Sequence, residues 1–235
     1  FSDNDLTQLI IPDSVTSIGG FAFLYNKLTT AKLSENLTEI SSALFQGNRL
    51  TEIEIPQSVT IIHSNAFFDN NITDIVIPEG VKTIGHYAFD RSIYLNKMGS
   101  LVIPKSVEEI GDTTFSGVFD TITVHPENLY FSDQNNKGLF NKDGTKMYLA
   151  TVSGAENIPA GIEHIPSYAF MGAGLTSIQL PDTVKTIGSM AFADNNLTEI
   201  TIGENIEDIG TEAFFNNPFD KIIVHQNNPY YSDQG

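Results

Sequence analysis

Phenylalanine recurs along this chain at a spacing that leaves few ways for the chain to fold. The first five copies follow one another at a constant interval of about 22 residues, within the range of repeat proteins. Four more follow later, so that the set is Phe1, Phe23, Phe45, Phe67, Phe89, Phe115, Phe170, Phe192 and Phe214. Every copy with sequence upstream of it has isoleucine five residues earlier. A fixed period of this length marks structural units that bury their apolar sides against one another. The spacing therefore predicts a solenoid of stacked coils with a column of phenylalanines in its core.

The copy from Leu50 to Asn71 shows what one coil contains. After Leu50 it reads T-E-I-E-I, which alternates polar and apolar residues as a short strand with one buried face does. Pro56 ends this strand because proline cannot donate the next hydrogen bond of a ladder. Two further apolar groups follow, first Val59 with Ile62 and then the A-F pair that ends at Phe67. Three apolar corners in a repeat of this length predict one turn of a solenoid.

Two other residue types also recur at fixed positions. Glycine follows the repeated isoleucine in five copies, at Gly19, Gly85, Gly111, Gly188 and Gly210. We expect a corner there that needs either a φ above zero or the close approach of the next coil. Asparagine stands three residues after the repeated phenylalanine in six copies, at Asn4, Asn26, Asn48, Asn70, Asn195 and Asn217. Because turns favour asparagine for its backbone hydrogen bonds, we predict a ladder of side-chain amides between coils rather than a ligand site.

The period is interrupted at two places. The segment G-L-F-N-K-D-G-T-K-M-Y-L contains two apolar runs around Asp143 and Gly144, a pattern typical of a β-hairpin, which we place at about residues 138–150. The step from Phe89 to Phe115 is longer than the steps before it, and the four extra residues are expected to form a bulged loop at residues 91–100. The repeats otherwise fill the chain, which starts within one of them. We therefore expect a single domain over residues 1–235 that is a fragment of a longer protein.

Charge and composition restrict the partners. Lysine and arginine total 12 against 29 aspartates and glutamates, and the formal charge of −17 repels phosphate backbones and anionic lipid surfaces. We therefore expect no nucleic-acid partner. The chain has no cysteine, which excludes disulfides and thiolate zinc sites. No apolar run reaches the roughly 18 residues of a membrane-spanning helix, so we expect no direct insertion into a membrane.

The repeated pattern L-x-x-I-x-I-P-x-x-V-x-x-I-G-x-x-A-F resembles the BspA-like leucine-rich repeat, also called the Treponema-type repeat, over essentially the whole chain. The N-P-Y-Y-S-D and G-L-F-N-K-D-G-T-K segments are similar to inserts that recur in this family. The chain departs from the family in having asparagine where cysteine is common, at Asn26, Asn48, Asn70, Asn195 and Asn217. The resemblance implies a right-handed, β-rich leucine-rich repeat solenoid with little regular helix. It also implies a bacterial surface or secreted protein, often one that takes part in adhesion to host proteins or to other cells.

No set of residues has the spacing of a catalytic centre. Such a centre would need a nucleophile, a base and an orienting group, or metal ligands, and neither H-E-x-x-H nor G-x-S-x-G occurs. The histidines are scattered over different coils, at His63, His86, His125, His164 and His225. The D-Q-N-N-K-G stretch from Asp133 departs from a calcium loop at Lys137 and Gly144. We therefore expect no enzymatic activity, no metal site and no cofactor.

The outward residues of the repeated strands are the candidate site, and we call them the outer face. They are Gln8, Ile10, Thr30, Lys32, Glu52, Glu54, Asp74, Val76, Ser177, Gln179, Glu199 and Thr201, and all but Ile10 and Thr30 form the candidate protein-binding face. We expect these residues to line one continuous sheet face. None of them is aromatic and the chain has no tryptophan, which argues against stacking of carbohydrate and favours a protein ligand.

Three hypotheses about function follow. In the first, the chain is a non-catalytic, adhesin-like module that binds a protein of a host or of another cell through the outer face. In the second, it is a structural stalk whose outer face is only solvated, since repeat arrays also serve as spacers. In the third, it is a recognition domain attached to a secreted hydrolase. The domains encoded beside it in the full reading frame would discriminate among the three.

Overall fold

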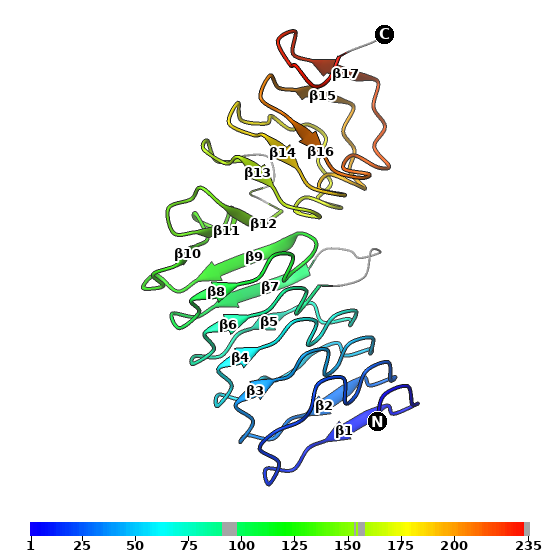
Figure 1. The fold of residues 1–235 in the computed structure, drawn as a ribbon, viewed down its shortest axis with the longest axis vertical. Helices are drawn as coiled ribbons and strands as arrows, with labels where there is room; N and C mark the ends of the chain where they lie inside the picture. The colour runs from blue at the N-terminus through cyan, green and yellow to red at the C-terminus, as the bar shows by residue number, and fades with distance from the viewer. Residues whose placement is uncertain (91–97, 153, 155–157, 233–235) are drawn as a thin grey trace. The chain divides into compact units, whose positions relative to one another are not determined.

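A computed structural model describes residues 1–90, 98–152, 154 and 158–232 of the chain. The chain divides into two compact units: unit 1 comprises Phe1–Ser116 and Thr123–Phe131, and unit 2 comprises Gly117–Ile122 and Ser132–Gly235. Within each unit short strands follow one another from coil to coil (Figure 1). The bulged loop expected at residues 91–100 lies outside the described residues except for its last three, which begin a strand. The expectation of a single domain over residues 1–235 stays a prediction.

The predicted strands of unit 1 form parallel sheets at the position expected from the repeat. One sheet has the order β1-β2 and another the order β5-β7-β9, in which most residues of β9 are counted in unit 2. The strands are β1 (Gln8–Ile10), β2 (Thr30–Lys32), β5 (Ile75–Val76), β7 (Met98–Ile103) and β9 (Phe119–Val124). Gln8 pairs with Thr30, the residue at the same position of the next repeat. The strands therefore pair in a register set by the repeat length.

Unit 1 has a further parallel sheet, which we call the second sheet because it uses a second strand position of the repeat, and its order is β3-β4-β6-β8. Its strands are β3 (Glu39–Ile40), β4 (Ile61–Ile62), β6 (Thr83–Ile84) and β8 (Glu109–Ile110). Ile40 pairs with Ile62 and Ile62 with Ile84, and all three side chains are fully buried. The sequence identified these isoleucines only as an apolar corner. Because each strand has two residues, it is too short to show an alternating pattern, and its pairing depends on the neighbouring coils.

Unit 2 repeats this arrangement after the hairpin. Strands β11 and β12 pair antiparallel and confirm the predicted hairpin, and β10 adjoins β11 in the same sheet. Two parallel sheets follow, in the orders β13-β14-β16 and β15-β17. The strands are β10 (Phe131–Ser132), β11 (Gly138–Asn141), β12 (Met147–Ala150), β13 (His164–Ile165), β14 (Thr186–Ile187), β15 (Glu199–Ile202), β16 (Asp208–Ile209) and β17 (Lys221–Val224). The described part of the chain contains no helix, as the solenoid prediction requires.

The repeated phenylalanines form the predicted core column. Phe67 stacks on Phe45 with the ring centroids 5.6 Å apart and on Phe89 with the centroids 5.1 Å apart. In unit 2, Phe192 lies 5.0 Å from Phe170 and 5.3 Å from Phe214. Near-parallel aromatic pairs at these separations are favourable beyond the area that they bury, so the column links each coil to the next.

The repeated asparagines form the predicted ladder of amides. The Nδ2 of Asn195 donates to the main-chain oxygens of Phe170 and Phe192, at 2.8 and 2.9 Å, and its Oδ1 accepts from the Leu175 N–H at 2.9 Å. The same three kinds of bond are made by Asn48, Asn70 and Asn217. Each amide satisfies backbone groups of its own coil and of the previous one, so these asparagines have a structural role.

Four of the five repeated glycines, Gly85, Gly111, Gly188 and Gly210, are explained by close approach and not by a positive φ, whereas a Cβ atom at Gly19 would meet nothing within 4 Å. A Cβ atom at Gly85 would lie 2.5 Å from the backbone nitrogen of Ser64, and one at Gly188 would lie 2.4 Å from that of Ser167. Among the described residues, the left-handed corners of the repeat lie instead two residues before and two residues after the core phenylalanines. The residues before it are Phe21, Ala43, Asn65, Tyr87, Thr113, Tyr168, Met190 and Glu212, and those after it are Asp3, Tyr25, Gly47, Asp69, Gly117, Gly172, Asp194 and Asn216. These corners turn the chain on either side of the column, and most of them carry side chains that rarely adopt such a backbone.

Candidate functional site

The residues of the candidate protein-binding face are all exposed to solvent. Val76 is 63% exposed, and it follows Ile75, which is 2% exposed and points into the core of unit 1. The same alternation is seen along β15, where Glu199 and Thr201 are exposed while Ile200 and Ile202 are buried. The prediction of which strand residues point outward is therefore confirmed.

The expectation that the outer face is one continuous sheet is wrong. Residues 52–54 and 177–179 belong to no strand. Among the described residues, β2 has only β1 as a sheet neighbour and β5 has only β7, and no backbone hydrogen bond joins residues 30–33 to residues 51–55. The phenylalanine column, the amide ladder and the second sheet hold these coils together. Main-chain groups on the exposed side can bond to water, so a sheet ladder is not required there.

A hollow of about 460 Å³ lies between residues 30–33 and residues 51–55, two segments of unit 1 that do not pair with each other. Its lining residues are Thr30, Ala31, Lys32, Leu33, Glu35, Glu52, Ile53 and Glu54. Ala31 occupies the inward position that isoleucine or leucine occupies in other coils, such as Ile75, Leu101 and Ile200. Those larger residues are buried, whereas Ala31 and Ile53 are half-buried. The smaller side chain leaves the space beside Ile53 unfilled. The only signal for the hollow in the sequence was this alanine in L-T-T-A-K-L.

The carboxylates of the outer face differ in what they bind within the chain. Asp74 accepts hydrogen bonds from the backbone N–H and the hydroxyl of Ser100, both at 2.9 Å, and from the Thr73 hydroxyl at 3.0 Å. These bonds hold the pKa of Asp74 below its ordinary value, the backbone bond most strongly. Asp74 therefore anchors β7. Glu52 and Glu54, in contrast, make no side-chain hydrogen bond or ion pair within the described part of the chain, so they are free to contact a ligand.

Several lysines pair with carboxylates one coil away. The ion pairs are Lys27 with Asp5 (2.7 Å), Lys82 with Glu108 (3.4 Å), Lys105 with Glu127 (2.6 Å), Lys185 with Glu163 (2.8 Å) and Lys221 with Glu199 (4.0 Å). Hydrogen bonds from the lysines lower the pKa of Asp5, Glu127 and Glu163. Exposed pairs of this kind stabilise a fold little. They neutralise carboxylates of neighbouring coils, whereas Glu52 has no such partner among the described residues.

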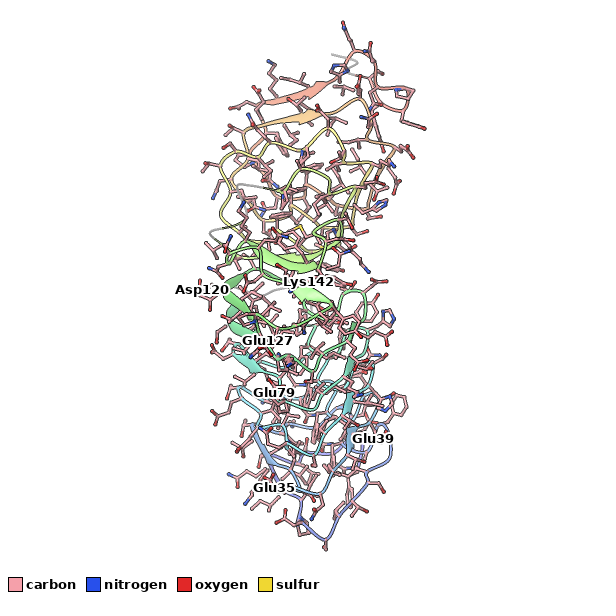
Figure 2. All side chains as sticks on the ribbon, turned by 90° about the vertical axis from the view of Figure 1, so that its left-hand side faces the viewer. Glu35, Glu39, Glu79, Asp120, Glu127 and Lys142 are labelled. Carbon is pink, nitrogen blue, oxygen red and sulfur yellow. The ribbon has the colours of Figure 1, made fainter. Side chains whose placement is uncertain are left out.

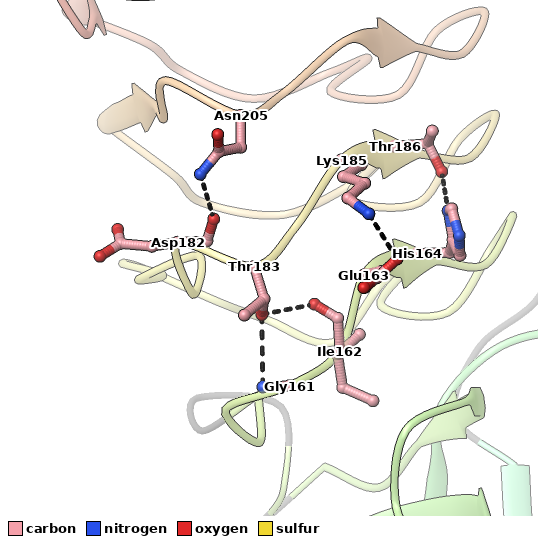
Figure 3. Close-up of polar contacts among 9 residues, drawn as sticks. All are labelled: Gly161, Ile162, Glu163, His164, Asp182, Thr183, Lys185, Thr186 and Asn205. Carbon is pink, nitrogen blue, oxygen red and sulfur yellow. Dashed lines mark hydrogen bonds and ion pairs between the residues drawn. The ribbon is translucent and has the colours of Figure 1, made fainter.

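Figure 3 shows how such contacts cross from coil to coil in unit 2. The Lys185 ammonium donates to Glu163, and the Thr183 hydroxyl donates to the main-chain oxygen of Ile162 at 2.8 Å. The Asn205 amide donates to the main-chain oxygen of Asp182 at the same distance. These polar residues are used to join coils, so they are not candidates for binding.

A line of glutamates follows the outer face along one edge of unit 1. Figure 2 shows Glu35, Glu79 and Glu127 one above another, with Glu39 on a different side of the same unit. Lys105 lies beside two of them, since its backbone N–H donates to Glu79 at 3.4 Å and its ammonium to Glu127. Glu35 is in no ion pair with the residues that the structure describes, and it lies at the rim of the hollow. The hollow is therefore the part of this edge where carboxylates are least neutralised.

The histidines have local structural contacts. His125 and His225 stand at equivalent positions, and in both the Nδ1 accepts from the backbone N–H two residues later, at 3.2 and 3.3 Å. His63 lies 3.0 Å from Glu39, and the Nδ1 of His164 lies 2.8 Å from the Thr186 hydroxyl. In the stretches that the structure describes, no group of three His, Asp or Glu side chains is placed to hold a metal ion. Those stretches also contain no helix long and apolar enough to cross a membrane.

Two solved structures share the fold of this chain. The pneumococcal vaccine antigen PcpA is 22% identical, with a TM-score of 0.75, and the similarity covers 94% of this chain and 62% of that one. A leucine-rich repeat protein from Eubacterium ventriosum is 24% identical, with a TM-score of 0.76, and the similarity covers 94% of this chain and 60% of that one. This chain thus spans less than two thirds of the length of either protein. At these identities the likeness shows the fold alone, a solenoid of leucine-rich repeats.

The repeat itself identifies the family. No curated protein matches the chain. The family model of the BspA type leucine rich repeat region matches six copies, over residues 1–121 and 155–234. These ranges contain the phenylalanine column and the amide ladder of each unit, and they leave out both strands of the hairpin. The chain belongs to the BspA-type leucine-rich repeat family.

Proposed function

We propose that this chain is a non-catalytic, adhesin-like module of a bacterial surface or secreted protein, which binds a protein ligand through its outer face. The observation that carries this proposal is that Glu52 and Glu54 are exposed and unpaired on a rigid, repeated scaffold. Repeat arrays of this kind present extended surfaces suited to protein recognition. PcpA, which shares the fold, is described as a vaccine antigen, and this supports a location outside the cell.

The electrostatics favour a ligand with a basic surface. The chain carries a formal charge of −17, and complementary charge raises the association rate and suppresses wrong partners. The outer face also carries exposed polar side chains, among them Lys32 in unit 1 and Gln179 and Thr201 in unit 2, and this composition is typical of the rim of a protein interface. The nature of the site therefore favours protein recognition over burial of a small apolar ligand.

Charge reversal tests this proposal. The intact chain is immobilised and its binding to a panel of serum and extracellular-matrix proteins is measured by surface plasmon resonance. We expect Glu52→Lys with Glu54→Lys to abolish binding of a ligand that uses unit 1, and Glu199→Lys to do so for one that uses unit 2. Glu109→Lys and Asp208→Lys are matched controls, because both residues are exposed but lie away from the outer face, in the sheets β3-β4-β6-β8 and β13-β14-β16. Equal binding by the outer-face variants and the controls would show that the outer face is not the site.

The stalk hypothesis is the alternative outcome of the same experiment. If no protein on the panel is captured, the array would be interpreted as a spacer. The location is tested separately, with an antibody raised against the chain and applied to intact cells of the bacterium that encodes it. Labelling of intact cells supports a surface location, and labelling only after lysis contradicts it.

A further inference from the structure

The hollow beside Ala31 has the chemistry of a pocket for a basic side chain. We propose that it takes a lysine or arginine side chain from an extended segment of the partner protein, an inference that rests on the proposed function and names the class of ligand. Its volume of about 460 Å³ is within the range of ligand pockets, about 300 to 1,000 Å³. It therefore has room for one long side chain and part of the segment that bears it.

The floor of the hollow suits the hydrocarbon part of such a side chain. Ala31, Leu33 and Ile53 contribute its apolar lining. Ala31 and Ile53 are half-buried, although the equivalent Ile75 and Ile200 are 2% exposed. Lysine and arginine bury their methylene groups on apolar surface while the charged end stays at the rim. A basic side chain would thus cover the apolar surface that Ala31 leaves open.

The rim suits the charged end. Glu35, Glu52 and Glu54 supply three carboxylates against one cation, Lys32. None of these three carboxylates is in a salt bridge within the described residues, whereas on the same edge Glu127 pairs with the Lys105 ammonium and Glu79 accepts from the Lys105 backbone N–H. Arginine binds carboxylates through two parallel hydrogen bonds, which makes it the stronger of the two candidates.

The backbone beside the hollow is also available. Residues 30–33 and 51–55 make no backbone hydrogen bond to each other, so their N–H and C=O groups facing the hollow are open to solvent or to a partner. Extended peptides bind open strand edges through main-chain hydrogen bonds, with alternate side chains entering pockets. The ligand is therefore an extended segment, with a basic residue as its anchor.

A peptide-binding experiment tests this inference. The probe is a fluorescein-labelled peptide that alternates arginine with valine, and its counterpart has glutamate in place of arginine. Fluorescence anisotropy with the full chain at about 50 mM salt, where screening is weak, should show saturable binding of the arginine peptide only. Glu52→Gln with Glu54→Gln should weaken binding by about tenfold or more. Glu109→Gln, which removes a carboxylate of the second sheet, should leave it within about twofold.

The decisive variant is Ala31→Ile, because it fills the hollow and leaves every charge in place. We expect it to weaken binding of the arginine peptide by about tenfold or more, with an unchanged circular dichroism spectrum. If Ala31→Ile binds the arginine peptide as tightly as the unmodified chain does, the proposal is overturned, because the attraction would then come from the acidic surface in general. Failure of the unmodified chain to bind the peptide would also overturn it. If Ala31→Ile does not fold, Ala31→Val fills part of the hollow with less strain, and the Gln variants leave the packing unchanged. The proposed function survives these failures if the charge-reversal variants still lose the protein ligand.

Discussion

The side-chain amide of Asn70 donates to the main-chain oxygen of Phe45, one coil earlier, at a distance of 2.8 Å. It also donates to the oxygen of Phe67 at 3.0 Å, and its own oxygen accepts from the Leu50 N–H at 3.0 Å. Asn70 is 4% exposed, so these partners have no access to bulk water. One side chain thus satisfies buried backbone groups in two coils and ties the two coils together.

Replacing this amide should weaken the solenoid. Asn70→Ala leaves two buried carbonyl groups and one N–H without that partner, and we expect the free energy of unfolding to fall by about 2 to 4 kcal/mol. Urea unfolding followed by circular dichroism measures the change. Asn4→Ala is the control, because Asn4 is exposed and its amide donates only to Ser2. Similar losses in both variants would contradict the structural role of the buried amide.

The phenylalanine column gives a second prediction. Phe67 is 1% exposed and stacks on both neighbouring rings. Phe67→Ala should lower the free energy of unfolding by about 3 to 5 kcal/mol, because it opens a cavity in the core. Phe215→Ala is the comparison. Because Phe215 is 54% exposed, its replacement should lower the free energy of unfolding by well under half as much as Phe67→Ala does. A loss at Phe67 no larger than that at Phe215 would remove Phe67 from the core column.

Glycine at the close contact should be required. In Gly85→Ala the new Cβ atom would meet the backbone of Ser64 at 2.5 Å, and backbone cannot move aside as a side-chain end can. We expect a loss of about 1 to 3 kcal/mol from overpacking, measured by thermal unfolding. Gly203→Ala is the matched control, because a Cβ atom there would meet nothing within 4 Å. A tolerated Gly85→Ala would show that the coils can separate at this corner without cost.

The hydrogen bonds of Asp74 predict a dependence of stability on pH. Because the pKa of Asp74 is lowered in the folded chain, its carboxylate stabilises the fold above the ordinary aspartate pKa of about 3.9, and this contribution is lost as the pH falls through the lower folded value. Asp74→Asn should therefore have a lower Tm than the unmodified chain at about pH 7, and the difference should shrink by about pH 2. A difference in Tm that does not change with pH would show that the charge of Asp74 is not responsible. Asp208→Asn, at an exposed strand residue, controls for the general effect of removing a carboxylate.

Much of the fold could be predicted because it depends on side chains that repeat. Phe67 and Asn70 have one role in every coil, and their spacing reveals it. Gly144, with a φ of +76°, lies in the turn of the hairpin that the Asp-Gly pair indicated. The role of Gly85 could not be chosen from the sequence, since a glycine there is compatible with a left-handed corner and with a close contact. Phe21 and Tyr87 adopt the left-handed backbone instead, with aromatic side chains that give no sign of it.

The candidate site was predicted only in part. The alternation of the strands determined that Glu52, Glu54 and Glu199 point outward, because successive side chains of extended backbone lie on opposite faces. The tertiary structure decided which of them are free: Asp74 is held by Ser100, whereas Glu52 and Glu54 border the hollow. Those differences depend on the separation and bonding of neighbouring coils. The repeat period predicts which residues stack on one another. Only the packing of one coil against the next decides whether the space between two coils is filled.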